Sequence, residues 1–349
     1  MKTTELARVA KAMVAPGKGI LAADESIGTA NKRFAVLGIA QTEEMRRQYR
    51  EMLLSMPKFG EYVSGVILFD ETIRQNDSHG TPLVEVIANA GSLPGIKLDK
   101  GTFPLQFTSG EKITEGLDGL PQRVDEYVEL GAKFAKWRAV IDIGPGTPSW
   151  KSVHANAHAL ARYAAICQTG GLVPIVEPEV MMDGDHTLER SFAVHEETLG
   201  AVFDELSQAG VDLGEIVLKP SMVISGTKCP VQASVAEVAE TTLTALLRWV
   251  PAAVAGIAFL SGGQSDEVAT AHLNEINRLA LERRAPWPIT FSYGRALQQP
   301  AIAAWAGSEA NVARAQAELL HRARLNGLAS LAKYEPAMEA DKSELAASH

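Results

Sequence analysis

Eight short runs of apolar, β-rich residues recur along the chain, and each ends in polar or charged residues. They cover residues 17–24, 63–70, 95–99, 134–143, 172–180, 214–223, 254–263 and 287–294. Within these runs the apolar residues are nearly continuous, which is typical of strands that are covered on both faces. This set of eight buried strands constrains the fold more than any other feature of the chain.

Segments with helical signals separate the runs. Residues 42–55 carry acidic side chains in their first turn and basic ones later, which complements the helix dipole. Ser234 and Glu237 have capping-box spacing before an apolar-periodic stretch that ends near Trp249. Further helices are expected at 150–168, 187–208, 297–306 and 308–333. Because strand and helix alternate eight times, the sequence predicts an α/β fold of the (β/α)8 barrel type.

A doubly wound parallel sheet is the alternative architecture. It would need no eighth strand, and it usually carries a glycine-rich first turn. The first run here continues as GILAADESIGTA, without a G-x-G-x-x-G pattern. No low-complexity linker precedes the last residues of the chain. We therefore predict one barrel domain over residues 1–334 and a mobile C-terminal tail over 335–349.

Composition excludes several classes of function. The net charge of −9 argues against non-specific nucleic-acid binding. The two cysteines, Cys167 and Cys229, are too few for a disulfide framework or a thiolate zinc site. The N-terminal residues lack the apolar core of a signal peptide, and no apolar run approaches the length of a membrane span. We expect a soluble cytoplasmic protein without membrane or nucleic-acid partners.

Two patterns raise the possibility of a metal site. His154 and His158 have helical i, i+4 spacing, but no glutamate occupies the position that H-E-x-x-H chemistry needs. They fall within a predicted helix, so a surface or packing role is favoured. The DGDH segment at 183–186 lacks the remaining ligands of a calcium loop. We predict neither a metal nor a cofactor.

The residues at the strand ends are mostly charged. In a barrel the carboxyl ends of the strands surround the active site. For any one residue, an exposed rim charge or a structural ion pair is the default interpretation, but gathering so many charges at one mouth without a purpose would be costly. The set favours a single polar site and comprises Asp24, Asp70, Lys97, Lys136, Arg138, Glu177, Glu179, Lys219, Ser261 and, just past the last strand, Arg295.

Lys219 lies in the apolar segment IVLKP on a predicted core strand. A lysine amine attacks a carbonyl carbon only in its neutral form, which both burial and a neighbouring cation favour. Lys136, two strands earlier, is the candidate cation. The alternative is a purely structural role for Lys219, as an ion pair with Glu177 or Glu179. Such a pair is compatible with nucleophilic chemistry.

Glu177 and Glu179 are two residues apart on a strand, so their side chains share a face. With Asp24 they form a cluster of carboxylates. Close carboxylates acquire different proton affinities, so that one donates a proton while another accepts. Schiff-base formation needs such an acid because the carbinolamine must lose water.

Two groups of residues have the composition of anion sites. Barrel phosphate sites commonly lie in the loops after strands seven and eight, where glycines let backbone N–H groups approach the anion. A second group lies on the opposite side of the mouth. Two anion sites on either side of a lysine nucleophile predict a bisphosphate substrate. The first group is Ser261, Gly262, Gly294 and Arg295, and the second is Ser26, Thr29, Arg33 and Lys97.

Seven motifs, in their order and spacing, resemble the class I fructose-bisphosphate aldolase family over about residues 5–335. They are AADESIGTANKR, IKLDKG, FAKWR, VPIVEPE, VLKPSMV, FLSGGQS and FSYGRALQ. The resemblance implies a (β/α)8 barrel, usually a homotetramer, that acts without metal in glycolysis and gluconeogenesis. The implied reaction is reversible cleavage of fructose 1,6-bisphosphate to dihydroxyacetone phosphate and glyceraldehyde 3-phosphate.

The resemblance also implies roles for the central residues. Lys219 would attack C2 of the ketose to form the Schiff base. Glu177 would act as the acid–base in carbinolamine dehydration and handle the C4 hydroxyl proton. Asp24 and Lys136 would assist C3–C4 cleavage, and Glu179 would organise the two lysines.

The outer residues of the motifs correspond to substrate contacts. By the same resemblance, Ser261, Gly262, Gly294 and Arg295 hold the C1-phosphate, and Arg138 contacts the substrate. Ser26, Arg33 and Lys97 belong to motifs associated with the second phosphate, and Thr29 keeps a hydroxyl where the family often has serine.

The chain departs from the family pattern in two places. Vertebrate members end in a tyrosine that exchanges the C3 proton of the enamine, whereas this chain ends in LAASH and its last tyrosine is Tyr334. The sequence therefore does not identify the C3 proton donor. Asp142 stands where a lysine is common, and we expect only a local change in packing or charge.

Three alternatives stay open from sequence. Another Schiff-base aldolase, such as a transaldolase or a keto-acid aldolase, would need only one anion site. A related ketose phosphate, fructose 1-phosphate or sedoheptulose 1,7-bisphosphate, would use the same lysine. A barrel kept as a binding protein would not need the intact set of Lys219, Lys136, Glu177 and Asp24.

Overall fold

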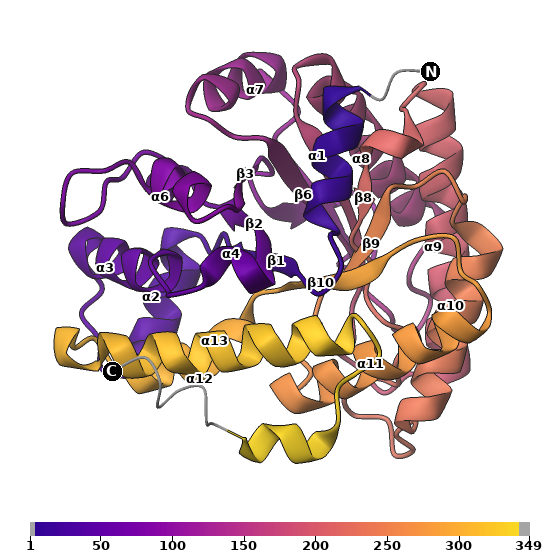
Figure 1. Ribbon diagram of the computed structural model, residues 1–349. Helices are drawn as coiled ribbons and strands as arrows, with labels where there is room; N and C mark the ends of the chain where they lie inside the picture. Colours follow the sequence, from indigo (N-terminus) through magenta and orange to yellow (C-terminus); the bar gives the residue numbers. More distant parts are fainter. Residues whose placement is uncertain (1–3, 342–349) are drawn as a thin grey trace.

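The computed structural model of the chain describes residues 4–341. Eight parallel strands close into a barrel in the order β1-β10-β9-β8-β7-β6-β3-β2, with helices around the outside (Figure 1). Each of the eight predicted runs supplies one barrel strand, so the (β/α)8 prediction is confirmed. The strands are β1 (Gly19–Ala23), β2 (Val63–Leu68), β3 (Leu93–Lys97), β6 (Phe134–Ile141), β7 (Val173–Val180), β8 (Val217–Leu218), β9 (Gly256–Phe259) and β10 (Ile289–Tyr293).

Helices connect consecutive strands and cover the barrel. The long ones are α8 (Trp150–Thr169), α9 (Leu188–Gln208), α10 (Val235–Trp249), α11 (Asp266–Glu282) and α13 (Val312–Ala329). The shorter helices are α1 (Glu5–Met13), α2 (Ile27–Val36), α3 (Glu43–Leu54), α4 (Phe59–Tyr62), α5 (Asp70–Ile73), α6 (Leu83–Asn89), α7 (Leu120–Glu129) and α12 (Arg295–Trp305), with 3₁₀ turns η1 (Leu213–Glu215), η2 (Glu309–Asn311) and η3 (Pro336–Ala340).

Capping residues start many of these helices where the sequence predicts. The capping box of α10 is present: the Ser234 hydroxyl accepts from the Glu237 N–H at 3.3 Å, and the Glu237 carboxylate accepts from the Ser234 N–H at 2.8 Å. Thr42 caps α3 with its side chain, which accepts from the Met45 N–H. Each cap satisfies N–H groups that the first turn leaves without intrahelical partners.

The floor of the barrel is closed by apolar side chains. Ile20, Ile67, Phe134 and Ile175 belong to one fully buried cluster inside it. The Phe134 ring fills the space that a Cβ would need at Gly95, so only glycine fits there. Because this end is packed, the barrel can admit a ligand only at its other end, where the strands finish.

The structure differs from the expected elements in three places. The run at 214–223 contributes only the two-residue strand β8, because the residues before it form η1 and Pro220 has no N–H to donate. The helix expected at 308–333 starts with η2, and α13 begins at Val312. An antiparallel hairpin of β4 (Thr102–Pro104) and β5 (Lys112–Thr114) lies between β3 and α7. This hairpin was not predicted, because each of its strands has only three residues.

The start of the expected C-terminal tail is packed against the barrel. Residues 336–340 form η3, in which Glu339 pairs with Arg322 at 2.5 Å and accepts from the Tyr334 hydroxyl at 2.9 Å. This ion pair ties the segment to α13, and the division into a barrel domain and a mobile tail stays a prediction. The rest of the expected tail, 342–349, lies outside the described residues. Within 4–341, no helix is long and apolar enough to cross a membrane.

Candidate active site

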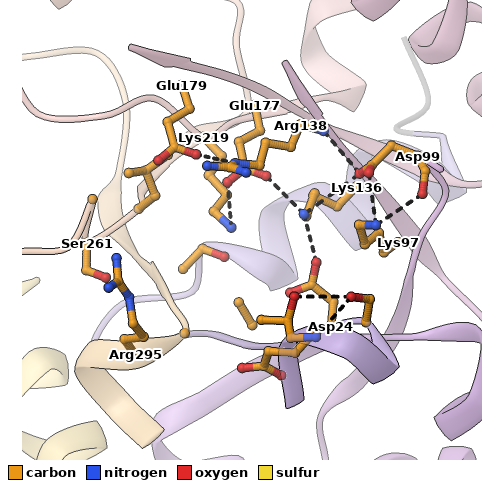
Figure 2. Close-up of a pocket in the computed structure, with 18 of the residues that line it drawn as sticks. Asp24, Lys97, Asp99, Lys136, Arg138, Glu177, Glu179, Lys219, Ser261 and Arg295 are labelled. Carbon is orange, nitrogen blue, oxygen red and sulfur yellow. Dashed lines mark hydrogen bonds and ion pairs between the residues drawn. The ribbon is translucent and has the colours of Figure 1, made fainter. Parts of the chain in front are cut away.

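A cavity of about 370 Å³ opens at the carboxyl ends of the barrel strands. Figure 2 shows the charged and polar side chains that point into it from β3, β6, β7 and the segments after β1, β8, β9 and β10. Six cationic and five carboxylate side chains line it. Apart from Asp70, the lining includes every residue of the predicted site: Asp24, Ser26, Thr29, Arg33, Lys97, Lys136, Arg138, Glu177, Glu179, Lys219, Ser261, Gly262, Gly294 and Arg295.

Asp70 is the one strand-end charge that the structure places elsewhere. It begins α5, where it pairs with Arg74 at 2.9 Å and accepts from the Tyr127 hydroxyl at 2.8 Å. It does not line the cavity. The expectation that it joins the mouth is wrong because α5 starts at this residue and carries its side chain outward to the α7 side.

Lys219 follows β8 directly. Its backbone N–H continues the β7–β8 pairing by donating to the Val176 carbonyl at 2.8 Å. Its side chain is only 4% exposed, and its Nζ lies 3.1 Å from Glu177 Oε1. The buried ion pair expected for a structural role is therefore present. It places the Glu177 carboxylate directly beside the Lys219 amine.

Lys136, in the middle of β6, is held by carboxylates. Its Nζ lies 2.7 Å from Asp24 Oδ2 and 3.3 Å from Glu177 Oε2 (Figure 2). Burial by itself would lower the pKa of Lys136, but the charges of Asp24, Glu177 and Asp99 outweigh it and hold the pKa well above its usual value. Lys136 is thus a fixed cation, and Glu177 lies between it and Lys219.

Asp24 and Glu177 are both ionised in this cluster. Burial would raise the pKa of Asp24 and of Glu177, but Lys136 and Lys219 outweigh it and hold both pKa values below their usual range. In the free site Glu177 is therefore a proton acceptor. It can serve as an acid only after taking up a proton, and the nearest side-chain nitrogen is Nζ of Lys219.

Glu179 has a different partner from the one expected. Its carboxylate accepts a short hydrogen bond from Nε of Arg138. Among the described residues, no ion pair joins Glu179 to either lysine. Burial would lower the pKa of Arg138, but Glu179 outweighs it and raises that pKa, so the guanidinium stays charged at the rim.

Two lining carboxylates were not singled out from the sequence. Asp99 pairs with Lys97 at 2.9 Å and lies 3.9 Å from Lys136. Glu25 pairs with Arg33 at 2.5 Å and with Arg50 at 2.6 Å. The signal for Asp99 was its position two residues after Lys97, at a strand end. Glu25 follows Asp24 directly and had no separate signal.

One end of the cavity is lined by glycines and a guanidinium. Gly262 and Gly263 have positive φ angles of 56° and 82°, a backbone form that favours glycine. Gly294 precedes α12, whose first turn has no side-chain cap, so its N–H groups are open to a ligand. Within residues 4–341, no carboxylate pairs with Arg295, whose guanidinium lies beside Ser261 (Figure 2).

The other end has more cations, but they are partly neutralised. Ser26 caps α2, and its hydroxyl lies 3.1 Å from the Thr29 hydroxyl. The two cations of this end, Arg33 and Lys97, are each paired with a carboxylate. This end therefore attracts an anion less strongly than the Arg295 end does.

The two histidines to which the sequence assigned no metal lie outside the cavity. His154 and His158 are on the surface of α8, and both contact Glu205, at 3.4 Å and 2.9 Å. Across residues 4–341, no group of three or more His, Cys, Asp or Glu side chains is arranged to hold a metal. Asp142 pairs with Lys112 of β5 at 3.4 Å, which agrees with the expected local change of charge.

Tyr334 is not part of the cavity wall. Its hydroxyl donates to Glu339 in η3, so it is not the C3 proton donor in this arrangement. The LAASH residues at 345–349 lie outside the described residues.

His195 makes the folded chain sensitive to acid. Burial lowers its pKa from 6.5 to about 4. The unfolded chain therefore takes up this proton near pH 6.5, whereas the folded chain takes it up only near pH 4, so the free energy of unfolding falls as the pH falls through this window. The loss amounts to about 3 kcal/mol at pH 4.

We expect His195→Gln to flatten this dependence. Urea unfolding at pH 7 and pH 4.5 should show a smaller acid-induced loss of stability in the variant than in the native chain. His272, whose pKa burial also lowers to about 4, stays in both proteins and leaves a residual slope. Equal losses in the two proteins would contradict the prediction.

A closed parallel barrel with a buried lysine beside a carboxylate at its mouth is typical of the class of Schiff-base lyases. A family model described as "Fructose-bisphosphate aldolase class-I" matches residues 5–348. The chain belongs to the class I fructose-bisphosphate aldolase family, and it is a carbon–carbon lyase that cleaves fructose 1,6-bisphosphate reversibly.

Relatives from distant organisms agree over nearly the whole chain. The chain is 56% identical to a probable fructose-bisphosphate aldolase class 1 of Xanthomonas campestris pv. campestris, covering 96% of this chain and 100% of the relative. It is 52% identical to fructose-bisphosphate aldolase C of Rattus norvegicus, covering 95% and 91%. A solved fructose-bisphosphate aldolase of Plasmodium falciparum, in complex with TRAP and a small-molecule inhibitor, superposes with a TM-score of 0.93 at 46% identity, covering 95% of each chain.

Proposed function

We propose that Lys219 is the Schiff-base nucleophile of this aldolase and that Glu177 is its acid–base partner. The observation that carries the proposal is the position of Glu177, with one carboxylate oxygen 3.1 Å from Lys219 and the other 3.3 Å from Lys136. A proton passing from Lys219 to Glu177 creates a neutral amine and a carboxylic acid at once. These are the two groups that carbinolamine formation and dehydration require.

The reaction then follows from the positions of these groups. The Lys219 amine adds to C2 of the open-chain ketose, and the carbinolamine loses its hydroxyl as water with a proton from Glu177. A carboxylate takes the C4 hydroxyl proton, the C3–C4 bond breaks, and its electron pair passes to the iminium. Glyceraldehyde 3-phosphate leaves, the enamine is protonated at C3, and hydrolysis releases dihydroxyacetone phosphate. Asp24 and Lys136 lie 2.7 Å apart at this centre and assist the cleavage step.

The two ends of the cavity orient the substrate. The Arg295 end takes the C1-phosphate, because its guanidinium and uncapped helix turn are open to an anion. The end formed by Ser26, Thr29, Arg33 and Lys97 takes the second phosphate, and Arg138 contacts the substrate at the rim. The ketone carbon is thereby held near Lys219.

Covalent trapping tests the proposal. Borohydride added with dihydroxyacetone phosphate should reduce the Schiff base to a stable amine, and peptide mass spectrometry should place the adduct on Lys219. Turnover should persist in EDTA. An adduct on another lysine, or no adduct in an active preparation, would contradict the assignment.

Removing the charge of Lys97 should weaken binding of the second phosphate selectively. In Lys97→Met we expect KM for fructose 1,6-bisphosphate to rise about tenfold, the size of one charge-assisted hydrogen bond to an anion. The KM for fructose 1-phosphate, which has no second phosphate, should stay within about twofold of its native value. Steady-state kinetics with both sugars checks this.

Lys100→Met is the matched control for this change. Lys100 is an exposed lysine of the same loop that does not line the cavity. An equal rise in KM for both sugars in Lys97→Met, or a comparable rise in the control, would contradict the assignment of the second phosphate site. The same assay with sedoheptulose 1,7-bisphosphate ranks the three candidate substrates by kcat/KM.

We also propose that the enzyme is a cytoplasmic homotetramer. Phe107 is fully exposed and Trp150 is 59% exposed, and large aromatic side chains on the surface are typical of subunit interfaces. Sedimentation equilibrium of the full chain tests the assembly, and a monomer at micromolar concentration would contradict it.

A further inference from the structure

The last residues of strand β7 lack a backbone partner on the side that faces β8. Pairing between the two strands ends at Val176, whose carbonyl accepts from the Lys219 N–H. Strand β7 continues to Val180, and Glu177 and Glu179 lie on this overhang. Backbone groups of alternate residues face the same neighbour, so Pro178, which has no N–H, and Val180 face the β8 side.

A side chain completes the sheet at this gap. The Val180 N–H donates to the Ser221 hydroxyl oxygen at 3.0 Å. Ser221 lies two residues after Lys219. The bond therefore connects the end of β7, which carries Glu177 and Glu179, to the segment that carries the proposed nucleophile. Ser221 is itself 5% exposed, and its bond is therefore shielded from water.

His195 fixes the direction of the Ser221 hydroxyl. Its Nδ1 lies 2.8 Å from the Ser191 carbonyl, which only accepts, so Nδ1 carries the proton. Its Nε2 is then an acceptor and receives the Ser221 hydroxyl proton at 3.1 Å. The bonds run in one direction, from Val180 through Ser221 and His195 to the Ser191 carbonyl of α9.

From this chain of bonds we infer that His195 and Ser221 are positioning residues, which hold the Glu177 carboxylate and the Lys219 amine at the separation that Schiff-base formation requires. The inference rests on the proposed roles of Lys219 and Glu177. Neither positioning residue lines the cavity, so they act through the strand ends and not on the substrate.

Packing alone provides little support for this strand end. Val180 belongs to a small apolar cluster of four residues, separate from the main core, with Ile141, Ile143 and Val194. The polar link crosses the β7–β8 gap, and this cluster does not, because its members come from β6, β7, α9 and the segment after β6. His195 is 3% exposed, and burial lowers its pKa to about 4, so its ring remains a neutral acceptor at the pH of the cell.

The test uses Ser221→Ala and the hydroxyl-retaining Ser221→Thr. We expect kcat for fructose 1,6-bisphosphate to fall about tenfold in Ser221→Ala, since small displacements of reacting groups have large effects on rate, while KM changes less than about twofold. The rate of borohydride trapping at Lys219 with dihydroxyacetone phosphate should fall in the same proportion. Ser221→Thr should keep at least about half of the native rate in both assays.

His195→Phe completes a double-mutant cycle. It keeps an aromatic ring in the buried site but removes the acceptor, so we expect its loss of kcat to resemble that of Ser221→Ala. The double variant should lose no more than the worse single variant, because both changes break one chain of bonds. All rates are expressed per folded protein, with thermal unfolding recorded in parallel.

The outcomes separate positioning from a merely structural role. A lower Tm with native kcat and native trapping rate in Ser221→Ala would overturn the inference, as would multiplicative losses in the double variant or an equal loss in Ser221→Thr. If Ser221→Ala does not fold, the comparison of His195→Phe with Ser221→Thr decides by the same criteria. Native enzyme that gives no Lys219 adduct would instead overturn the proposed function, so the two failures are distinguishable.

Discussion

Replacing Lys219 by methionine is expected to lower kcat for fructose 1,6-bisphosphate cleavage by about 10⁵- to 10⁶-fold, the loss typical of removing a covalent nucleophile. Methionine has a similar length but cannot form the iminium, so no electron sink remains for the C3–C4 electron pair. The measurement is coupled spectrophotometric turnover together with borohydride trapping, which should give no adduct.

The loss in Lys219→Met should not come from unfolding. Glu177 keeps its second partner, with Lys136 Nζ 3.3 Å from Oε2, so no buried carboxylate is left alone. Binding of the bisphosphate should also persist, because both anion ends are intact. Lys133→Met is the matched control, an exposed lysine next to β6 that should keep native kcat. Residual activity above about 1% of native in Lys219→Met would contradict the assignment of the nucleophile.

Replacing Glu177 by glutamine is expected to lower kcat by about 10²- to 10⁴-fold, the range of a positioned general acid–base. Glutamine has the same shape, but it cannot take the proton of Lys219 or return it to the leaving hydroxyl. The rate of borohydride trapping with dihydroxyacetone phosphate should fall with kcat, because carbinolamine dehydration precedes the trapped species.

A control separates this chemical effect from the change of charge. Glu129→Gln removes an exposed carboxylate at the end of α7 and should keep native kcat. In Glu177→Gln, Lys136 keeps its contact with Asp24 at 2.7 Å, so the cluster is not dismantled. A native trapping rate in this variant would show that Glu177 does not act in dehydration, and another lining acid would then have to be sought.

Periodicity located the strands because a barrel strand is buried on both faces. Its residues must be apolar almost without interruption, and the chain shows that pattern eight times. Helix starts were equally visible where a capping side chain makes a local hydrogen bond, as at Ser234. The hairpin β4–β5 was missed, because three-residue exposed strands carry no such pattern.

The membership of the site was predictable because each barrel strand ends at the same mouth. A charged residue after an apolar run is therefore placed there by topology alone. The rule failed at Asp70, where a helix begins at once. It also did not single out Asp99 and Glu25, which each lie two residues beyond a strand end.

The sequence by itself determined the barrel and most of the residues that line its mouth, since these depend on periodicity and on residue types at fixed places in the chain. Only the tertiary structure decided the pairing among charges. Glu177 bridges two lysines, and Glu179 pairs with Arg138. Ser221, in the segment after β8, bonds both Val180 of β7 and His195 of α9. The reason is physical: such contacts join residues from different strands, and ångström differences in side-chain position choose among partners of equal charge.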